Sequence, residues 1–170
     1  MAENKVMPRR RLILMQGKPA CGKSTIAEAI KDFLISSSRI VSTDKYLYEG
    51  SEYRYTPERQ AAAHRQAEAE AFQAMYDEVE LVIIDNTNLK FEWCQAYIEA
   101  AELFKYDIQV IRVDATPGLQ WTQNAMRTSD RKVPLEHFKE IVTQDVLYPP
   151  WRYSWKTRLR EAWRWIRPER

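Results

Sequence analysis

Residues 17–24, with the sequence GKPACGKS, constrain this chain more than any other segment. They match the pattern G-x-x-x-x-G-K-[ST] at every fixed position. Gly17 and Gly22 let backbone N–H groups close around phosphate oxygens without a Cβ in the way. Lys23 is expected to reach the β- and γ-phosphates of ATP, and the hydroxyl of Ser24 to bind Mg²⁺. The pattern therefore predicts a loop that holds nucleotide phosphates.

The surroundings of this loop are those that phosphate binding requires. A short apolar run at residues 11–15 precedes the loop and is typical of a buried strand. Residues 23–35 follow as a predicted helix, whose N-terminus favours anions. The residues expected to contact the nucleotide are Gly17, Lys18, Pro19, Ala20, Cys21, Gly22, Lys23, Ser24 and Thr25.

The rest of the chain alternates short apolar runs with helical patterns. Further strands are expected at residues 39–43, 81–85 and 108–113, and further helices at residues 57–77, 90–105, 117–126 and 134–144. Thr56 can cap the helix that Pro57 begins, and the tyrosine-rich residues 45–56 before it are expected to be irregular. The alternation predicts an α/β fold of three layers, the P-loop nucleoside triphosphate hydrolase and kinase fold. We expect a mostly parallel sheet of four or five strands and a C-terminal helical extension.

The length of 170 residues suits one domain. We place that domain at residues 1–150, with a lid near residues 127–133. No apolar run approaches the roughly 20 residues that span a bilayer, and no signal-peptide core follows the N-terminus, so we expect a cytoplasmic protein. Two cysteines are too few for a disulfide framework. One of them, Cys21, is either a small filler residue in the loop or a thiol that Lys23 and the helix N-terminus make oxidisable.

The last twenty residues, 151–170, form a basic, tryptophan-rich extension that we expect to pack on the same domain. They hold seven Lys or Arg against two Asp or Glu, a net charge of +5, and four of the six tryptophans. Basic residues interleaved with aromatic ones suit a nucleic-acid strand, since cations neutralise phosphates and rings stack on bases. The alternative is packing, because Leu159, Trp163 and Ile166 fall on one helical face.

Two further predicted strands end in an aspartate: the run at residues 40–44 ends in Asp44, and the run at residues 81–85 ends in Asp85. Ligands of open parallel sheets bind beyond the carboxyl ends of the strands, so both aspartates should face the phosphate loop. Transfer of a phosphoryl group to an alcohol needs a base for the hydroxyl proton and a carboxylate for Mg²⁺. The plainer alternative for each aspartate is a strand-end turn or a helix cap.

Five segments in this order and spacing carry a resemblance over roughly residues 10–146. They are residues 17–25, Ser42-Thr43-Asp44, Tyr53-Arg54-Tyr55-Thr56, Asp85-Asn86-Thr87-Asn88-Leu89, and Asn124-Ala125-Met126-Arg127 followed by Val133-Pro134. With these segments the chain resembles the 5′-kinase domain of the bacteriophage polynucleotide kinase and its P-loop relatives, which include proteins similar to NEDD4-binding protein 2. The phosphate loop alone is generic, whereas the segment after the buried strand is much more specific.

The resemblance implies roles for individual residues, with ATP and Mg²⁺ as cofactors and DNA or RNA as acceptor. Asp44 occupies the position of the general base, and Arg127 that of a lid arginine on the ATP phosphates, which Arg131 can assist. Catalysis would then rest on Lys23, Asp44 and Arg127, and the metal on Ser24 and Asp85. The acceptor side would comprise Tyr46, Tyr53, Arg54, Asn86, Thr87 and Asn88.

The chain departs from the phage enzyme at three positions. Leu47 and Gln123 replace arginines, and Asn86 replaces an aspartate. The changes at Leu47 and Asn86 lie on the acceptor side and leave the ATP chemistry intact. Three functions therefore stay open: a kinase of nucleic-acid hydroxyls, most simply of 5′-OH ends, a small-molecule kinase of nucleosides, sugars or antibiotics, and a non-catalytic ATP-binding module.

Overall fold

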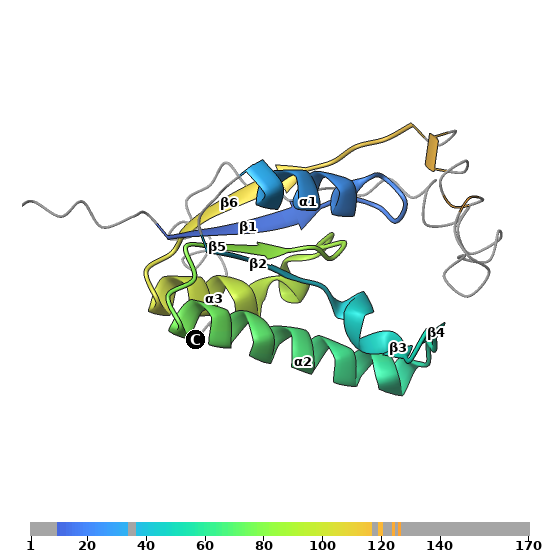
Figure 1. Ribbon diagram of the computed structural model, residues 1–170, viewed down its shortest axis with the longest axis horizontal. Helices are drawn as coiled ribbons and strands as arrows, with labels where there is room; N and C mark the ends of the chain where they lie inside the picture. Colours follow the sequence, from blue (N-terminus) through green and yellow to red (C-terminus); the bar gives the residue numbers. More distant parts are fainter. Residues whose placement is uncertain (1–9, 34–36, 117–118, 121–123, 125, 127–170) are drawn as a thin grey trace, which may run out of the picture.

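The computed structural model describes residues 10–33, 37–116, 119–120, 124 and 126. Its elements, with η for 3-10 helices, are β1 (Arg11–Gln16), α1 (Lys23–Phe33), β2 (Ser38–Val41), η1 (Thr43–Leu47), β3 (Tyr48–Glu49), β4 (Glu52–Tyr53), α2 (Pro57–Tyr76), β5 (Leu81–Ile84), η2 (Phe91–Trp93), α3 (Gln95–Leu103) and β6 (Asp107–Arg112). Over these residues, four parallel strands form one sheet in the order β2-β5-β1-β6. The three-layer α/β fold that the sequence predicts is confirmed (Figure 1).

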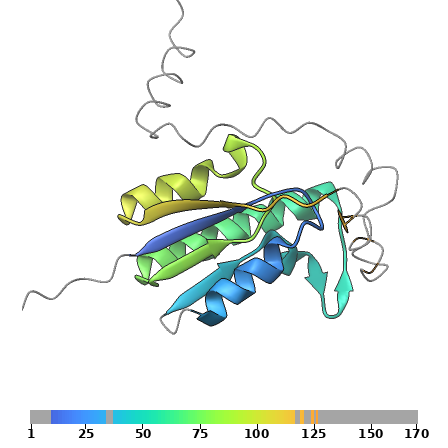
Figure 2. The ribbon, with the colours of Figure 1, turned by 90° about the horizontal axis from the view of Figure 1, so that it is seen from above.

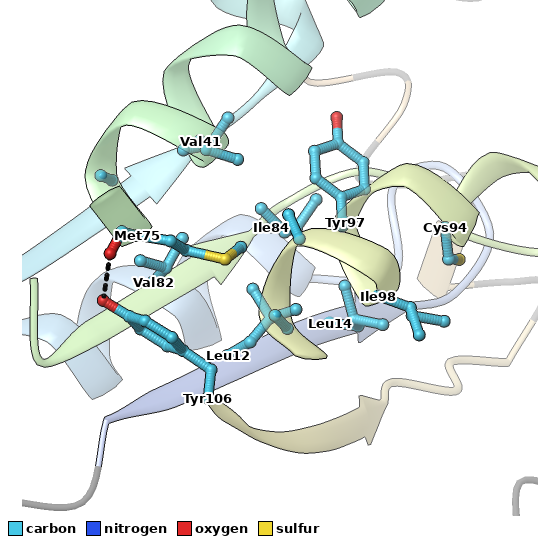
Figure 3. Packing of buried hydrophobic residues seen from close by; sticks show 14 of the residues in the cluster. Leu12, Leu14, Val41, Met75, Val82, Ile84, Cys94, Tyr97, Ile98 and Tyr106 are labelled. Atoms are coloured by element: carbon cyan, nitrogen blue, oxygen red, sulfur yellow. Dashed lines mark hydrogen bonds between the residues drawn. The ribbon is translucent and has the colours of Figure 1, made fainter. Parts of the chain in front are cut away.

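The sheet separates two apolar cores. Helix α1 covers one face, and α2 and α3 cover the other (Figures 1 and 2). On the α2–α3 face, the core includes Leu12, Leu14, Val82 and Ile84 from the central strands and Met75, Tyr97 and Ile98 from the helices (Figure 3). Because β1 and β5 are covered on both faces, their sequences are continuous apolar runs rather than alternating ones.

Helix α2 begins where the sequence predicts. The side chain of Thr56 accepts a hydrogen bond from the N–H of Arg59, and Pro57 occupies the first turn. The buried positions of the helix are mostly alanines, at residues 63, 67, 71 and 74. Small residues at this spacing allow α2 to lie close against its neighbours, so it forms a firm support under η1 and β2.

The parallel strands all end at one edge of the sheet. That edge gathers the phosphate loop after β1, the 3-10 helix η1 after β2, and residues 85–90 after β5 (Figure 1). In an open parallel sheet this is the edge at which ligands bind.

The expectation that residues 45–56 are irregular is wrong for most of the segment, up to residue 53. Helix η1 continues to Leu47, and β3 and β4 then form an antiparallel hairpin. Gly50, at φ +62°, and Ser51 make the two-residue turn, and Tyr48 lies opposite Tyr53. A glycine turn flanked by cross-strand tyrosines stabilises a short hairpin. The polar composition of the segment gave no apolar alternation from which to predict these two strands.

The other elements lie close to their expected positions. The helix expected at residues 90–105 is divided at Cys94 into η2 and α3. Of the helix expected at residues 117–126, the structure describes Leu119, Gln120, Asn124 and Met126, all helical. The helix expected at residues 134–144 and the extension at residues 151–170 lie outside the described residues. Within the described part of the chain, every helix is too short or too polar to cross a membrane.

Candidate active site

The phosphate loop is built around two glycines with different demands. A Cβ at Gly17 would lie 2.4 Å from the carbonyl oxygen of Val113 and 2.7 Å from Sγ of Cys21, so the backbone packs too closely there for any side chain. Gly22 has φ +94°, a conformation that side chains rarely adopt, and a Cβ there would meet nothing within 4 Å. The first glycine thus fixes the start of the loop, and the second leaves open the space beside its backbone.

Lys23 is the first residue of α1, and its side chain is held by the loop itself. The residue is 8% exposed. Its Nζ donates to the carbonyl oxygen of Lys18 at 2.9 Å and lies 3.7 Å from Sγ of Cys21. The ammonium group is therefore positioned by the loop before any phosphate arrives, as preorganised electrostatic stabilisation requires.

Asp85 follows β5 and lies beside the start of α1. Its pKa is raised because burial penalises the carboxylate, although a hydrogen bond with Ser24 and the charge of Lys23 act in the opposite direction. The charge of Asp44 raises the pKa further, so the two aspartates lie within electrostatic reach of each other. This juxtaposition is the one that their positions after β2 and β5 predict.

The oxygen atoms around Asp85 fit a Mg²⁺ ion. Oδ1 of Asp85 is buried and has no hydrogen-bond partner among the described residues. The Ser24 hydroxyl lies at the same carboxylate. Mg²⁺ prefers oxygen ligands and usually shares them with substrate phosphates, so one hydroxyl and one carboxylate suit it. Over the described residues, no group of three or more His, Cys, Asp or Glu side chains gathers that could hold a metal by itself.

Residues 85–88 tie the carboxyl end of β5 to the phosphate loop. The carbonyl oxygen of Thr87 accepts a hydrogen bond from the N–H of Gly17 at 3.0 Å. Nδ2 of Asn88 donates to the carbonyl oxygen of Met15 at 2.8 Å, and Gln16 donates back to the carbonyl oxygen of Asn88 at 3.0 Å. Asn88 is 2% exposed, so it supports the loop from below and presents no surface to an acceptor.

Asn86 connects β5 to the helix that carries Asp44. Its Oδ1 accepts a hydrogen bond from the N–H of Thr43 at 2.9 Å, and its Nδ2 lies 3.5 Å from the hydroxyl of Tyr97. The side chain of Thr43 lies 3.3 Å from Nδ1 of His64 on α2. Leu47, at the other end of η1, is 2% exposed and part of the core. These contacts fix η1 at both ends.

Asp44 itself is exposed at the edge of the sheet. The hydroxyl of Tyr53 on β4 donates to its Oδ1 at 3.3 Å. The carboxylate is thus accessible to an acceptor and held by the hairpin.

Glu70 on α2 is the main anchor for η1 and β2. Its carboxylate accepts hydrogen bonds from Tyr46 at 2.6 Å, Lys45 at 3.0 Å and Arg39 at 3.4 Å. Burial by itself would raise the pKa of Glu70, but the hydrogen bonds from Tyr46 and Lys45 bring it below its ordinary value. Burial and the bond to Glu70 raise the pKa of Tyr46 to about 12. Tyr46, expected on the acceptor side, is therefore engaged with α2.

The sequence motifs did not reveal His64 and Glu70. Both lie within α2, where they read as polar residues of an amphipathic helix. The sequence signal that could have drawn attention to Glu70 is its position on the same helical face as the buried alanines Ala63 and Ala67, one turn further on. Arg127 and Arg131, expected to form the lid, lie outside the described residues.

The comparisons with known proteins agree with this geometry. A protein family described as an AAA domain matches residues 12–145. Human NEDD4-binding protein 2 is 28% identical over 142 residues, which are 80% of this chain and 8% of the human protein. The chain therefore spans a small part of that relative.

Solved structures share the fold. A chain of the Pnkp1/Rnl/Hen1 RNA repair complex superposes with a TM-score of 0.65 at 18% identity, over 84% of this chain and 46% of that one. A gluconokinase from Sinorhizobium meliloti 1021 gives a TM-score of 0.55 at 14% identity, over 85% of this chain and 78% of that one. At such identities the likeness shows the fold alone, the P-loop kinase fold, which a chain of an RNA repair complex and a gluconokinase share.

Proposed function

Because the chain belongs to the AAA domain family, with a phosphate loop and a P-loop kinase fold, we propose that it is an ATP-dependent kinase acting on nucleic acid. It transfers the γ-phosphate of ATP to a hydroxyl, most simply the 5′-OH end of a polynucleotide. The phosphate donor binds at residues 17–25, and the acceptor binds beside Asp44.

One observation carries the proposal. Lys23, Asp85 and Asp44 follow three different strands of the sheet. Asp85 lies within electrostatic reach of both Lys23 and Asp44. A nucleotide-binding loop alone needs the lysine and the metal carboxylate. The additional exposed carboxylate, held by Tyr53, is what transfer to an alcohol requires and what simple nucleotide binding does not.

The residues support a direct displacement. Asp44 accepts the proton of the acceptor hydroxyl, whose oxygen attacks the γ-phosphorus. The bond from that phosphorus to the bridging oxygen breaks, and ADP leaves with the bonding electrons. Lys23 stabilises charge on the transferring group and the leaving oxygen, and we assign the same role to Arg127. Mg²⁺, held through Ser24 and Asp85, would supply further neutralisation of phosphate charge.

The choice of a nucleic acid rests on two supports. The chain with TM-score 0.65 comes from an RNA repair complex, and the last twenty residues carry a net charge of +5 with four tryptophans. A strand end requires contacts to phosphates beyond the reacting nucleotide, and such a basic segment can provide them.

A small-molecule kinase is the second candidate, and a specific observation favours it. Arg54, the basic residue expected on the acceptor side, is paired with Glu49 at 2.9 Å and with Glu52 at 2.7 Å. Paired in this way, it offers less to a polyanionic strand than a free arginine would. The gluconokinase neighbour shows that the same fold serves small acceptors.

The test is transfer from γ-labelled ATP to a panel of acceptors. The panel holds 5′-OH DNA and RNA oligonucleotides, the same oligonucleotides with 5′-phosphate, nucleosides, and gluconate. We expect label on the 5′-OH strands and none on the 5′-phosphorylated ones. Label on gluconate alone would establish the second candidate. ATP binding without transfer to any acceptor would refute the kinase proposal.

A further inference from the structure

Segment 39–59, which includes Asp44, contains four basic side chains, and all four are paired with glutamates. Arg39 and Lys45 share Glu70 at 3.4 Å and 3.0 Å, Arg54 pairs with Glu49 and Glu52, and Arg59 also pairs with Glu49. Glu49 and Glu52 thus balance the charges of Arg54 and Arg59, so these ion pairs leave the hairpin electrostatically neutral rather than basic.

The hairpin offers aromatic surface instead. The rings of Tyr48 and Tyr53 pack edge to face, with centroids 5.3 Å apart and an interplanar angle of 68°. Both rings are partly exposed, and Tyr55 next to them is 55% exposed. The hydroxyl of Tyr53 donates to Asp44, so the aromatic pair stands directly beside the candidate base.

We infer that the acceptor is recognised as a neutral nucleoside, whose base stacks on the Tyr48–Tyr53 pair, and that a phosphate on the 3′ side of this nucleoside is not required. The inference rests on the proposed function and names the chemistry of its acceptor. A free nucleoside and the terminal nucleoside of a strand share this chemistry, and the test below separates them.

Charge and burial both support this assignment. A phosphate beside the acceptor sugar would need an available cation, and Arg54 would have to leave two carboxylates to supply it. Leu47, three residues after the candidate base, is part of the core at 2% exposure and has no charge to offer. Stacking needs no charge, and every base presents a face to which an aromatic ring can bind.

Tyr48 and Tyr53 have separable parts in this scheme. The ring of Tyr48 contributes stacking surface. Tyr53 contributes its ring and also a hydroxyl that positions the carboxylate of Asp44. Tyr53 is therefore a positioning residue for the transfer step as well as a contact to the base.

The first test compares adenosine, adenosine 3′-monophosphate and a 5′-OH hexanucleotide as acceptors. We expect kcat/KM for the 3′-monophosphate to lie within about threefold of that for adenosine. A gain of about 100-fold from the 3′-phosphate would overturn the inference and leave the kinase proposal intact. If kcat/KM is equal for the two monomers and far higher for the hexanucleotide, the natural acceptor is the terminal nucleoside of a strand.

Binding separates the two proposals if no transfer occurs. Adenosine is titrated into the protein with a non-hydrolysable ATP analogue and Mg²⁺. Saturable binding that Tyr48→Leu weakens about tenfold would support nucleoside recognition even where the kinase proposal fails. Absence of adenosine binding in this titration would overturn the inference.

The second test uses the tyrosines. Tyr53→Phe keeps the ring, so we expect an unchanged KM for adenosine and a lowered kcat. Tyr53→Leu and Tyr48→Leu remove stacking surface and should raise KM about tenfold, within the range for base stacking on aromatic rings. ATP binding serves as the check on folding. An unchanged KM in both leucine variants would exclude stacking at this hairpin.

The third test releases the arginines. The double variant Glu49→Gln, Glu52→Gln keeps side-chain shape and removes both partners of Arg54. It should create a preference for adenosine 3′-monophosphate over adenosine of about tenfold. Glu99→Gln, an exposed carboxylate on α3, is the matched control with no expected change in preference. If the double variant shows the same preference between the two acceptors as the wild type, the ion pairs of Arg54 do not determine acceptor selectivity.

Discussion

The donor and acceptor sides of the site are built in different ways. The phosphate loop is held by buried contacts and main-chain groups: Gly17 is in contact with Val113, Thr87 accepts from its N–H, and Lys23 is 8% exposed. Asp44 is exposed, and the hairpin beside it is held by ion pairs and a tyrosine hydroxyl on the surface.

This difference follows from what each side must bind. Under the proposed function the donor is always the same triphosphate, and a fixed main-chain loop suits such a ligand. The acceptor varies among kinases of this fold, and surface side chains can change without disturbing the core. Under the proposed function, the core beneath the site would specify the donor, and the hairpin would specify the acceptor.

The largest expected effect comes from the donor side. Lys23→Ala removes the charge that stabilises the transferring phosphoryl group, and turnover should fall about 10³-fold or more. Turnover with saturating ATP and acceptor measures it, with circular dichroism as the check on folding. Lys31→Ala, on the exposed face of the same helix, is the control. A folded Lys23→Ala within tenfold of wild type would contradict the assignment of the loop.

Asp44→Asn should be the largest effect on the acceptor side. The amide keeps the shape of the side chain but cannot take the acceptor proton, so turnover should fall about 10²-fold. ATP affinity, measured by equilibrium titration, should stay within about twofold. Asp32→Asn, an exposed carboxylate on α1, is the matched control. A parallel loss of ATP affinity would point to a metal role for Asp44 instead.

The position and backbone of the phosphate loop could be predicted from the sequence, because the motif specifies main-chain geometry. Gly17, Lys23 and Ser24 lie where the pattern requires, and the strand ends bring Asp44 and Asp85 together as parallel topology demands. Such features depend on local sequence and on a sheet whose strands all point one way.

The acceptor side could be predicted only in part. No motif marks Glu70 or His64, since their contacts join residues up to 31 positions apart, as in the pair Arg39 and Glu70. Asn88 stood in a specific motif, yet it is buried under the loop, because the motif preserves structure as well as contact with ligands. Long-range side-chain networks carry no local signal from which to predict them.

Asp85 interacts with Lys23 on the donor side and with Asp44 on the acceptor side, and Asp85→Asn tests its role. The pKa of Asp85 is raised mainly by burial, so the folded protein binds its proton more tightly than the unfolded chain does. The stabilisation from protonation is complete below the unfolded pKa and is lost as the pH rises through the folded pKa. The ionised group therefore costs stability at neutral pH, and Asp85→Asn should be more stable than wild type there.

That gain should shrink at pH values below the ordinary aspartate pKa. Urea unfolding without nucleotide, at pH 7 and at acid pH, measures the difference between variant and wild type. Asp107→Asn, an exposed carboxylate at the start of β6, is the control. The same variant should need more Mg²⁺ for half-maximal turnover. A gain in stability that is equal at both pH values would contradict the raised pKa.

The smallest effect should come from the basic segment at residues 151–170, which lies outside the described residues. If the hairpin binds only the terminal nucleoside, contacts to the phosphates of the rest of a strand must come from another part of the chain. Replacement of Arg158, Arg160, Arg164 and Arg167 by glutamine removes four charges. It should weaken oligonucleotide binding and leave adenosine phosphorylation unchanged.

Salt distinguishes charge from packing in this variant. Each phosphate contact on a single strand contributes a slope of about −0.7 to the dependence of log K on log salt, so the slope should flatten. The matched variant with four lysines keeps the charge and should retain the slope. Should the glutamine variant bind oligonucleotides as wild type does at low salt, the segment serves packing alone. The acceptor would then be a free nucleoside, recognised entirely at the Tyr48–Tyr53 hairpin.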